Sequence, residues 1–409
     1  MNPDTLKKNM LWNAAGNIIY LMSQWVMTVL VTVLGGLTDA GILSVAMSVS
    51  ATFQTLALFG IRNFQVSDTQ RKYTDSTYTG FRTLTCAGAL LICMVFSLIS
   101  GYLGGQLLAI FLFMMFRLAE TYSDVLHGIA QKNDRLDIAG KSFSIKGIGL
   151  LVCFLAGFYL SKDLNVGLLL MTLFSCASTL LYDFPAVRKL SEFRLLDPLS
   201  RCGKLALETL PLCVYLFLAS AISTVPRLIL EMQCGKEVLG AYASIFAPAL
   251  LLQSATGYLY NPFATQFAEW NRQKDRRAFC NLLLKLVLVI LGISAVILLA
   301  AQFLGEFALV LVFGEQIREY VYLLQPILIV NILISYFGLL SMVVIVLRNF
   351  RWLLAGYAAG FLTVLFLTGP AIRLWGVNGT SYSLIAAAVM TSLILAIGIL
   401  RSDLLIRKN

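Results

Sequence analysis

Arg117 is the residue whose type and position point most directly to chemistry. It lies inside a long apolar stretch, and Glu120 and Asp124 follow three and seven positions later. Residues at these spacings share one face of a helix. A planar guanidinium can bind phosphate oxygens in pairs and stays charged in a poorly hydrated site. The carboxylates can tune that charge or take up a proton or sodium. The alternative is an Arg–Glu pair within the helix that only fixes packing.

Two further arginines interrupt or close apolar stretches. Arg227 follows Pro226, which lacks a backbone donor, and Glu231 comes four positions later. A helical Arg227–Glu231 pair is the alternative to an anion-binding role. Arg62 closes the second stretch, where a basic residue also serves as an anchor on the inner side of a membrane. Other charges near the ends of apolar stretches can snorkel or pair with basic loops: Lys146, Lys285, Asp183 and Glu208.

Uncharged polar side chains recur in the same stretches. Asn13, Asn17 and Gln24 are spaced by four and seven positions, which places them on one helix face. Gln253 lies in a later stretch with other polar and aromatic residues. Such groups offer hydrogen bonds and stacking faces to a hydroxyl-rich ligand such as a sugar. Hydrogen bonds between neighbouring helices are the alternative.

The composition excludes several classes of protein. Of the 409 residues, 59% are hydrophobic and 13% are charged, and the mean hydropathy is +0.82. An ordinary soluble domain has about 45–50% apolar and about 25% charged residues. A soluble enzyme, a disordered chain and a nucleic-acid-binding module are therefore excluded. A single histidine, His127, and scattered cysteines without a CxxC motif argue against a metal site. We expect no cofactor, and the lack of a Walker motif argues against ATP hydrolysis.

The apolar stretches predict an all-α, polytopic membrane protein with about twelve transmembrane helices, since one span needs about 20 residues. The first stretch is too long for a signal peptide and lacks a cleavage site, so we expect it to be retained. Polar residues within several stretches indicate helices that line a polar cavity. The stretches lie near residues 10–34, 40–61, 80–101, 105–127, 143–161, 165–187, 205–232, 238–262, 279–303, 320–346, 352–372 and 377–400.

Lysines and arginines are concentrated in alternate loops. The formal net charge is +10, and in a membrane protein an excess of basic residues first indicates orientation. One set of loops holds little more than Lys162, Lys236, Arg318 and Arg373. The other set is rich in basic residues, among them Arg71, Lys72, Arg82, Lys132, Arg135, Arg188, Lys204, Arg272 and Arg348. The second set is assigned to the inside, so both termini are predicted to be cytoplasmic.

Short correspondences indicate that the chain is a duplication. They occur in the same order and in equivalent loops: Gly41/Gly240, Gln54/Gln253 and Ala139-Gly140/Ala355-Gly356. Because each half has an even number of spans, the halves should share one orientation in the bilayer. We therefore predict two parallel six-helix bundles around a central polar cavity: residues 1–190, a cytoplasmic linker at 191–204, and residues 205–409. Such parallel repeats are typical of transporters.

The run Gly35–Ser44 and the helix end Leu58–Arg62 carry a resemblance to a known family. They resemble the pattern of polysaccharide exporters of the multidrug/oligosaccharidyl-lipid/polysaccharide (MOP) superfamily, which is a small loop with glycine, a helix and a closing end of the Gly-aliphatic-x-Arg type. Span count, loop spacing and the duplicated halves extend the resemblance over the whole chain. It implies an O-antigen or capsule flippase, which moves an undecaprenyl-pyrophosphate-linked oligosaccharide across the bacterial cytoplasmic membrane by alternating access.

The resemblance also suggests roles for the polar residues. The expected substrate-binding residues are Arg117, Arg227, Arg62, Asn13, Asn17, Gln24 and Gln253. Glu120 and Asp124 are expected to couple transport to a proton or sodium. Other implied partners are membrane lipid and the polymerase and glycosyltransferases of polysaccharide or lipopolysaccharide synthesis, and no nucleic acid.

Two other classes of function stay open. A cation-coupled small-molecule or drug efflux transporter of the same fold would, by the resemblance, carry a carboxylate in its first or seventh helix. The first apolar stretch has none. A membrane enzyme such as a glycosyltransferase or polymerase would need a large external loop or paired acidic residues, and no loop is long enough. We therefore expect a transporter and not an enzyme.

Overall fold

The computed structural model describes residues 3–68, 72–260 and 263–401, and these residues form helices and connecting segments without a β-strand. The chain folds into two compact units, residues 1–220 and 221–409. The helices of the first unit are α1 (Pro3–Leu58), α2 (Ile61–Ser67), α3 (Asp75–Ile99), α4 (Gly104–Lys132), α5 (Leu136–Ser161), α6 (Leu164–Ser178), the π-helix η1 (Thr179–Asp183) and α7 (Phe184–Arg188).

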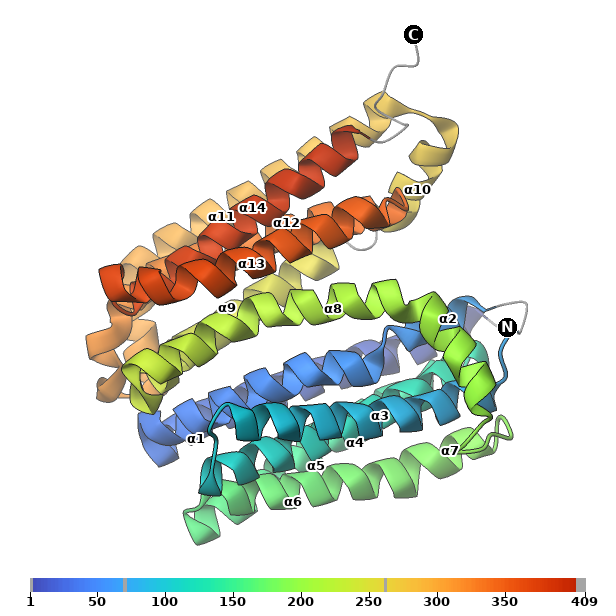
Figure 1. Cartoon of the computed structure of the whole chain (residues 1–409), viewed down its shortest axis with the longest axis horizontal. Coiled ribbons are helices and arrows are strands. Elements are labelled where there is room, and N and C mark those ends of the chain that lie inside the picture. Colours follow the sequence, from blue (N-terminus) through green and yellow to red (C-terminus); the bar gives the residue numbers. More distant parts are fainter. Residues whose placement is uncertain (1–2, 69–71, 261–262, 402–409) are drawn as a thin grey trace. The chain divides into compact units, whose positions relative to one another are not determined.

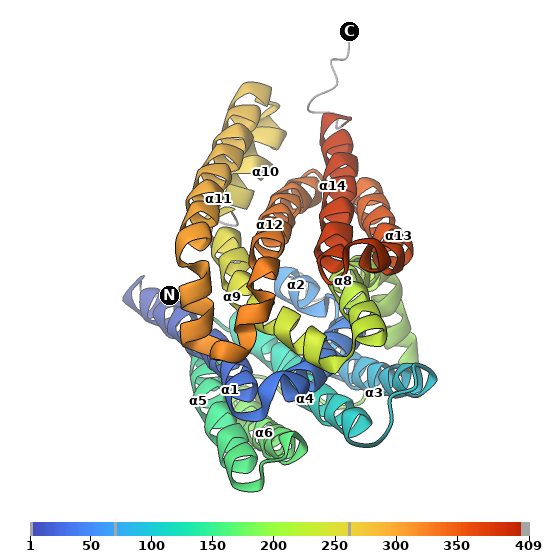
Figure 2. The same ribbon diagram turned by 90° about the vertical axis from the view of Figure 1, so that its left-hand side faces the viewer.

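Helix α8 (Leu199–Cys234) leads from the first unit into the second. The second unit continues with α9 (Lys236–Tyr260), α10 (Ala264–Gln273), α11 (Arg276–Phe313), the 3₁₀-helix η3 (Glu315–Leu323), α12 (Leu324–Val346), α13 (Phe350–Trp375) and α14 (Asn378–Leu400). Helices α13 and α14 pack side by side, as do α12 and α14 and α9 and α12 (Figure 2).

Within the first unit, long helices pack side by side in a bundle (Figure 1). Helix α1 contacts α3, α4 and α5, and α6 packs on both α4 and α5. The short helices α2 and α7 lie at one end of this bundle (Figure 1). The η1 segment that follows α6 also contacts α4 and α5, so polar side chains between these three elements are enclosed by helices.

Ten helical segments among the described residues are long and apolar enough to cross a membrane. The first, Leu11–Leu58, has 48 residues, about twice the length that one crossing needs. It is divided at Gly36, whose φ of 78° and ψ of −177° are not helical. If Leu11–Leu58 counts as two crossings and the 25-residue helix α9 is added, the ten segments become twelve. This agrees with the predicted number of about twelve. The predicted all-α, polytopic membrane fold is thus confirmed.

The segment between α7 and α8 is fixed along the first turns of α3. The Thr79 hydroxyl donates to the Arg194 carbonyl at 2.6 Å, and the Thr83 hydroxyl donates to the Leu195 carbonyl at 2.9 Å. The backbone N–H of Arg194 in turn donates to the Ser76 hydroxyl at 3.1 Å. This part of the predicted linker is therefore held against the first unit.

Candidate functional site

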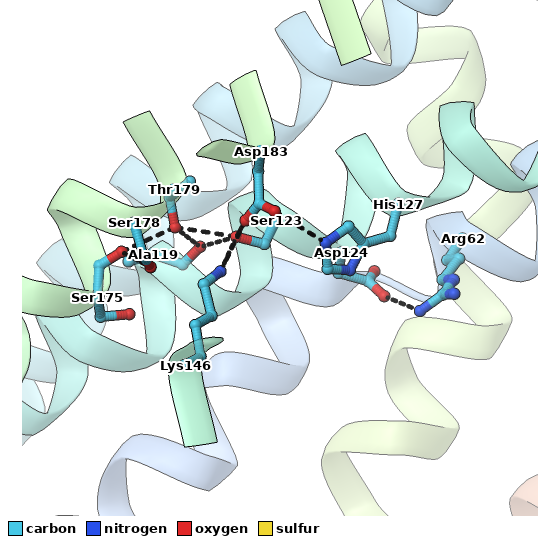
Figure 3. Close-up of polar contacts among 10 residues, drawn as sticks. All are labelled: Arg62, Ala119, Ser123, Asp124, His127, Lys146, Ser175, Ser178, Thr179 and Asp183. Atoms are coloured by element: carbon cyan, nitrogen blue, oxygen red, sulfur yellow. Dashed lines mark hydrogen bonds and ion pairs between the residues drawn. The ribbon is translucent and has the colours of Figure 1, made fainter. Parts of the chain in front are cut away.

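A buried polar cluster joins three elements of the first unit, and we call it the α4–α6 cluster. It consists of Ser123 and His127 on α4, Lys146 on α5, and Thr179 and Asp183 on η1 (Figure 3). Each of these residues is at most 5% exposed. The Asp183 carboxylate lies 2.8 Å from the Lys146 ammonium and 3.2 Å from Nε2 of His127. The Ser123 hydroxyl lies 2.7 Å from Asp183 and 2.9 Å from the Thr179 hydroxyl, and Lys146 also donates to Ser123.

The wide turn η1 places both of its cluster residues on the side of α4 and α5. The N–H of Phe184 bonds to the Thr179 carbonyl, five residues back, as in a π-helix. Pro185 follows and has no N–H to offer to the preceding turn, which favours this local widening. Thr179 and Asp183 can then contact the same partner, Ser123.

The α4–α6 cluster contains one ammonium and one carboxylate in addition to the histidine. A charge enclosed within membrane-spanning helices is costly unless an opposite charge accompanies it. The sequence suggested snorkelling for Lys146 and pairing with basic loops for Asp183, and the structure instead brings the two together. The sequence does show opposite charges in two neighbouring apolar stretches, which could have suggested an ion pair. It does not show how the two helices are rotated, and therefore not whether the two side chains face each other.

Arg117 and Glu120 form the helical pair that the sequence offered as one alternative. Nη1 of Arg117 lies 3.0 Å from Oε2 of Glu120, and the two side chains are 20% and 14% exposed. The guanidinium also lies over the rings of Phe113 and Phe116, at 5.2 and 5.5 Å from their centroids. The guanidinium is therefore packed against aromatic rings but stays partly exposed.

Asp124, which shares a helix face with Arg117 in sequence, has different partners. Its Oδ1 lies 3.0 Å from Nη1 of Arg62, and its Oδ2 lies 3.1 Å from Nη2 of Arg82. Arg62 also donates to Oε1 of Gln131 at 3.3 Å. Arg82 donates its other terminal nitrogen to the Ala57 carbonyl at 2.6 Å. One carboxylate on α4 thus connects α2 with α3.

The prediction that Arg82 is a loop charge is wrong. Helix α3 begins at Asp75, so Arg82 lies two turns inside it and is fully buried. Thr74 is the N-cap, and its hydroxyl accepts the N–H of Thr77. A threonine followed by an aspartate is a recognisable signal for the start of a helix.

The other expected substrate-binding residues are dispersed. The Asn17 side chain donates to the Asn13 carbonyl at 2.8 Å, so these two are neighbours on α1. Oε1 of Gln24 is buried, with no hydrogen-bond donor near it among the described residues. The Arg227 guanidinium lies 4.5 Å from the ring centroid of Phe246 in the second unit. The side chain of Gln253 lies outside the described part of the chain.

A cavity of about 570 Å³ lies beside the connection between α2 and α3. Its lining includes the carboxylates of Asp68, Asp75 and Glu192 and the ammonium of Lys132. Burial raises the pKa of Asp68, but hydrogen bonds from the backbone N–H groups of Tyr73 and Lys72 and from the Tyr78 hydroxyl, together with the positive charge of Lys132, bring this pKa below its ordinary value. The excess of carboxylates disfavours an anionic ligand here. No group of three metal-ligating side chains occurs among residues 3–68, 72–260 and 263–401.

Comparisons with known proteins agree with this architecture. Capsular polysaccharide biosynthesis protein CapF of Staphylococcus aureus is 24% identical over 314 residues, which are 76% of this chain and 78% of CapF. The solved structure of the lipid II flippase MurJ, in an inward closed conformation, superposes with a TM-score of 0.69 at 11% identity. The match covers 95% of this chain and 87% of MurJ.

A multidrug resistance MATE family transporter of the MOP superfamily, in an inward-facing conformation, matches with a TM-score of 0.61 at 13% identity. The match covers 96% of this chain and 93% of the transporter. Both solved structures are named as transport proteins, and at 13% identity or less they show that this chain shares their fold. A family model described as "Polysaccharide biosynthesis protein" matches residues 6–265, more than half of the chain. The chain therefore belongs to the polysaccharide biosynthesis protein family.

Proposed function

We propose that the protein is a flippase for an undecaprenyl-pyrophosphate-linked oligosaccharide, an O-antigen or capsule repeat unit, in the bacterial cytoplasmic membrane. Family membership and the similarity to a capsular polysaccharide biosynthesis protein support this proposal. The observation that carries it is the partly exposed Arg117–Glu120 pair inside membrane-spanning helix α4. A charge at such a position is costly and calls for a functional reason.

Arg117 is suited to bind the pyrophosphate reversibly. Its guanidinium already has one anionic partner at 3.0 Å, so a phosphate oxygen can take the place of the Glu120 carboxylate. Glu120 would then take up a proton or sodium, which gives the cycle a direction. Bound substrate shifts the equilibrium between inward-open and outward-open states only by its different affinity for the two states.

The remaining expected contacts complete the proposal. Arg227 would provide a second guanidinium for the pyrophosphate, and Arg62 would make the first contact at the inner leaflet. Amide side chains would bind the saccharide: Asn13, Asn17, Gln24 and Gln253. We further propose that both termini face the cytoplasm, because the basic loops alternate with loops that are poor in lysine and arginine.

The test is substitution of Arg117 in cells that depend on this protein for surface polysaccharide. Loss of a charge-assisted hydrogen bond of about 1.5–3 kcal/mol corresponds to a decrease in transport of at least about tenfold. We expect Arg117→Ala to accumulate lipid-linked saccharide on the cytoplasmic face and Arg117→Lys to restore part of the transport. Arg272→Ala is the matched control, because the Arg272 side chain is 78% exposed.

If the Arg117→Ala strain has normal protein abundance and surface polysaccharide at the wild-type level, Arg117 contributes only to packing and the proposed binding role is wrong. A strain without the protein that keeps its polysaccharide but becomes sensitive to drugs would instead support a cation-coupled efflux transporter.

A further inference from the structure

We propose that Asp124 is a shared counter-ion that releases Arg62 to the pyrophosphate of the substrate, and that Arg82 is the positioning residue that makes this release possible. The inference rests on the proposed function, since it assigns the anion to a lipid-linked pyrophosphate. It replaces the sequence-based expectation that Asp124 takes up a coupling ion.

The first observation is the charge balance around Asp124. One carboxylate lies between two guanidiniums, so the three side chains together carry one positive charge. Arg62 is 29% exposed, whereas the Arg82 side chain is fully buried (Figure 3 shows the Arg62–Asp124 pair). The surplus charge is therefore accessible only at Arg62.

The second observation is that the two arginines are fixed to different degrees. Arg82 donates to the carbonyl of Ala57 in the last turn of α1, at 2.6 Å. Arg62 lies on the seven-residue helix α2. This helix begins directly after Phe59 and Gly60, whose φ angles of 50° and 66° interrupt the helical path. Besides Asp124, Arg62 donates to the neutral side-chain amide of Gln131, at 3.3 Å. An incoming anion can thus displace Asp124 from Arg62 without disturbing Arg82.

The third step concerns the energy of that exchange. A largely buried carboxylate that loses its only cation carries a large desolvation penalty. Asp124 is 20% exposed and keeps its 3.1 Å contact with Arg82 when Arg62 leaves. The phosphate oxygens take over the guanidinium donors that Oδ1 gave up, so one charge-assisted bond replaces another. The free-energy difference between the bound and the released state then stays small, so the substrate can both bind and dissociate, as transport requires.

This arrangement leads to opposite effects for two substitutions. Asp124→Asn removes the competitor of the anion and should tighten pyrophosphate binding about tenfold, because a hydrogen bond between charged groups is involved. Arg82→Gln leaves Asp124 with Arg62 alone and should weaken binding by a similar factor. In the double variant Arg62 again lacks a charged competitor, so its affinity should return at least to that of the wild type.

Asp137 provides a matched control. It also lies between two basic side chains, at 2.8 Å from Arg135 and 3.4 Å from Lys141, but these side chains are 49% and 44% exposed. Asp137→Asn should leave the affinity for pyrophosphate unchanged. This control distinguishes the specific effect of removing the Asp124 carboxylate from a general effect of removing one carboxylate from the protein.

The experiment titrates undecaprenyl diphosphate into the purified full-length protein in nanodiscs of a neutral lipid and measures Kd by calorimetry. Inorganic pyrophosphate and phosphatidylglycerol are titrated in parallel arms. We expect tighter binding by Asp124→Asn, weaker binding by Arg82→Gln, and recovery in the double variant. A purely structural role of this cluster would instead give weaker binding by Asp124→Asn, because both guanidiniums would lose their counter-ion. If Arg82→Gln does not fold, the Asp124→Asn and Asp137→Asn pair still carries the test.

If the wild type binds undecaprenyl diphosphate and Asp124→Asn binds it with the same or lower affinity, the shared counter-ion is refuted. The proposed function is not affected by that result. Equal binding of phosphatidylglycerol would overturn the assignment to a pyrophosphate. Failure of the wild type to bind undecaprenyl diphosphate at all would overturn the proposed function, and the inference with it.

Discussion

Removal of either partner of the Lys146–Asp183 pair should destabilise the first unit, and by unequal amounts. The two side chains are 2% and 0% exposed, and loss of one partner of a buried ion pair costs about 3–5 kcal/mol. Lys146→Met leaves Asp183 with the Ser123 hydroxyl at 2.7 Å and His127 at 3.2 Å, so we expect the lower value, about 3 kcal/mol. Asp183→Asn leaves the ammonium without a carboxylate in the α4–α6 cluster, so we expect about 5 kcal/mol.

The double variant Lys146→Met/Asp183→Leu should be more stable than either single variant. It removes both charges and replaces them with apolar side chains of similar size, which is often neutral or stabilising. The hydroxyl of Ser123 and the ring of His127 then lose partners, at about 1–2 kcal/mol. We therefore expect a net loss of no more than about 2 kcal/mol.

Thermal unfolding in detergent measures these differences. One kcal/mol corresponds to about 2–4 °C for a unit of this size, so the single variants should lower Tm by about 6–12 °C and about 10–20 °C. Lys285→Met is the control, because Lys285 also enters a span from its basic end but is exposed on α11. A double variant no more stable than Asp183→Asn would refute the reasoning, since the cost would then not arise from an unpaired charge.

Three further predictions concern the backbone, the inter-helix segment and the topology. Gly36→Ala should cost about 1–3 kcal/mol, because a φ of 78° combined with a ψ of −177° is accessible essentially only to glycine. Gly88→Ala in helix α3 should be neutral or stabilising, and Tm in detergent compares the two variants. Thr79→Val loses the 2.6 Å bond to the Arg194 carbonyl and should speed proteolysis of the segment between α7 and α8; an unchanged cleavage rate contradicts its fixation on α3. Reporter fusions at Lys204 and at the C-terminus should both read as cytoplasmic, and a periplasmic signal at either would reject the topology.

The membrane fold was accessible from the sequence because the length of an apolar stretch is a property of consecutive residues. A helix must satisfy its own backbone in lipid, so about 20 apolar residues indicate a span without knowledge of its neighbours. The start of α3 was less accessible. A capped helix extends beyond its apolar part, and Arg82 therefore lies inside the helix although it resembles a loop charge.

The polar contacts between helices depended on the tertiary structure. Sequence spacing placed Arg117 and Glu120 on one face, and they do form a pair, because both lie on one helix and its geometry is fixed. It could not place Asp124 between Arg62 and Arg82, or Lys146 beside Asp183, since these contacts join different helices. Which side chains meet across two helices depends on the rotation of each helix and on local features such as η1, and only packing determines these.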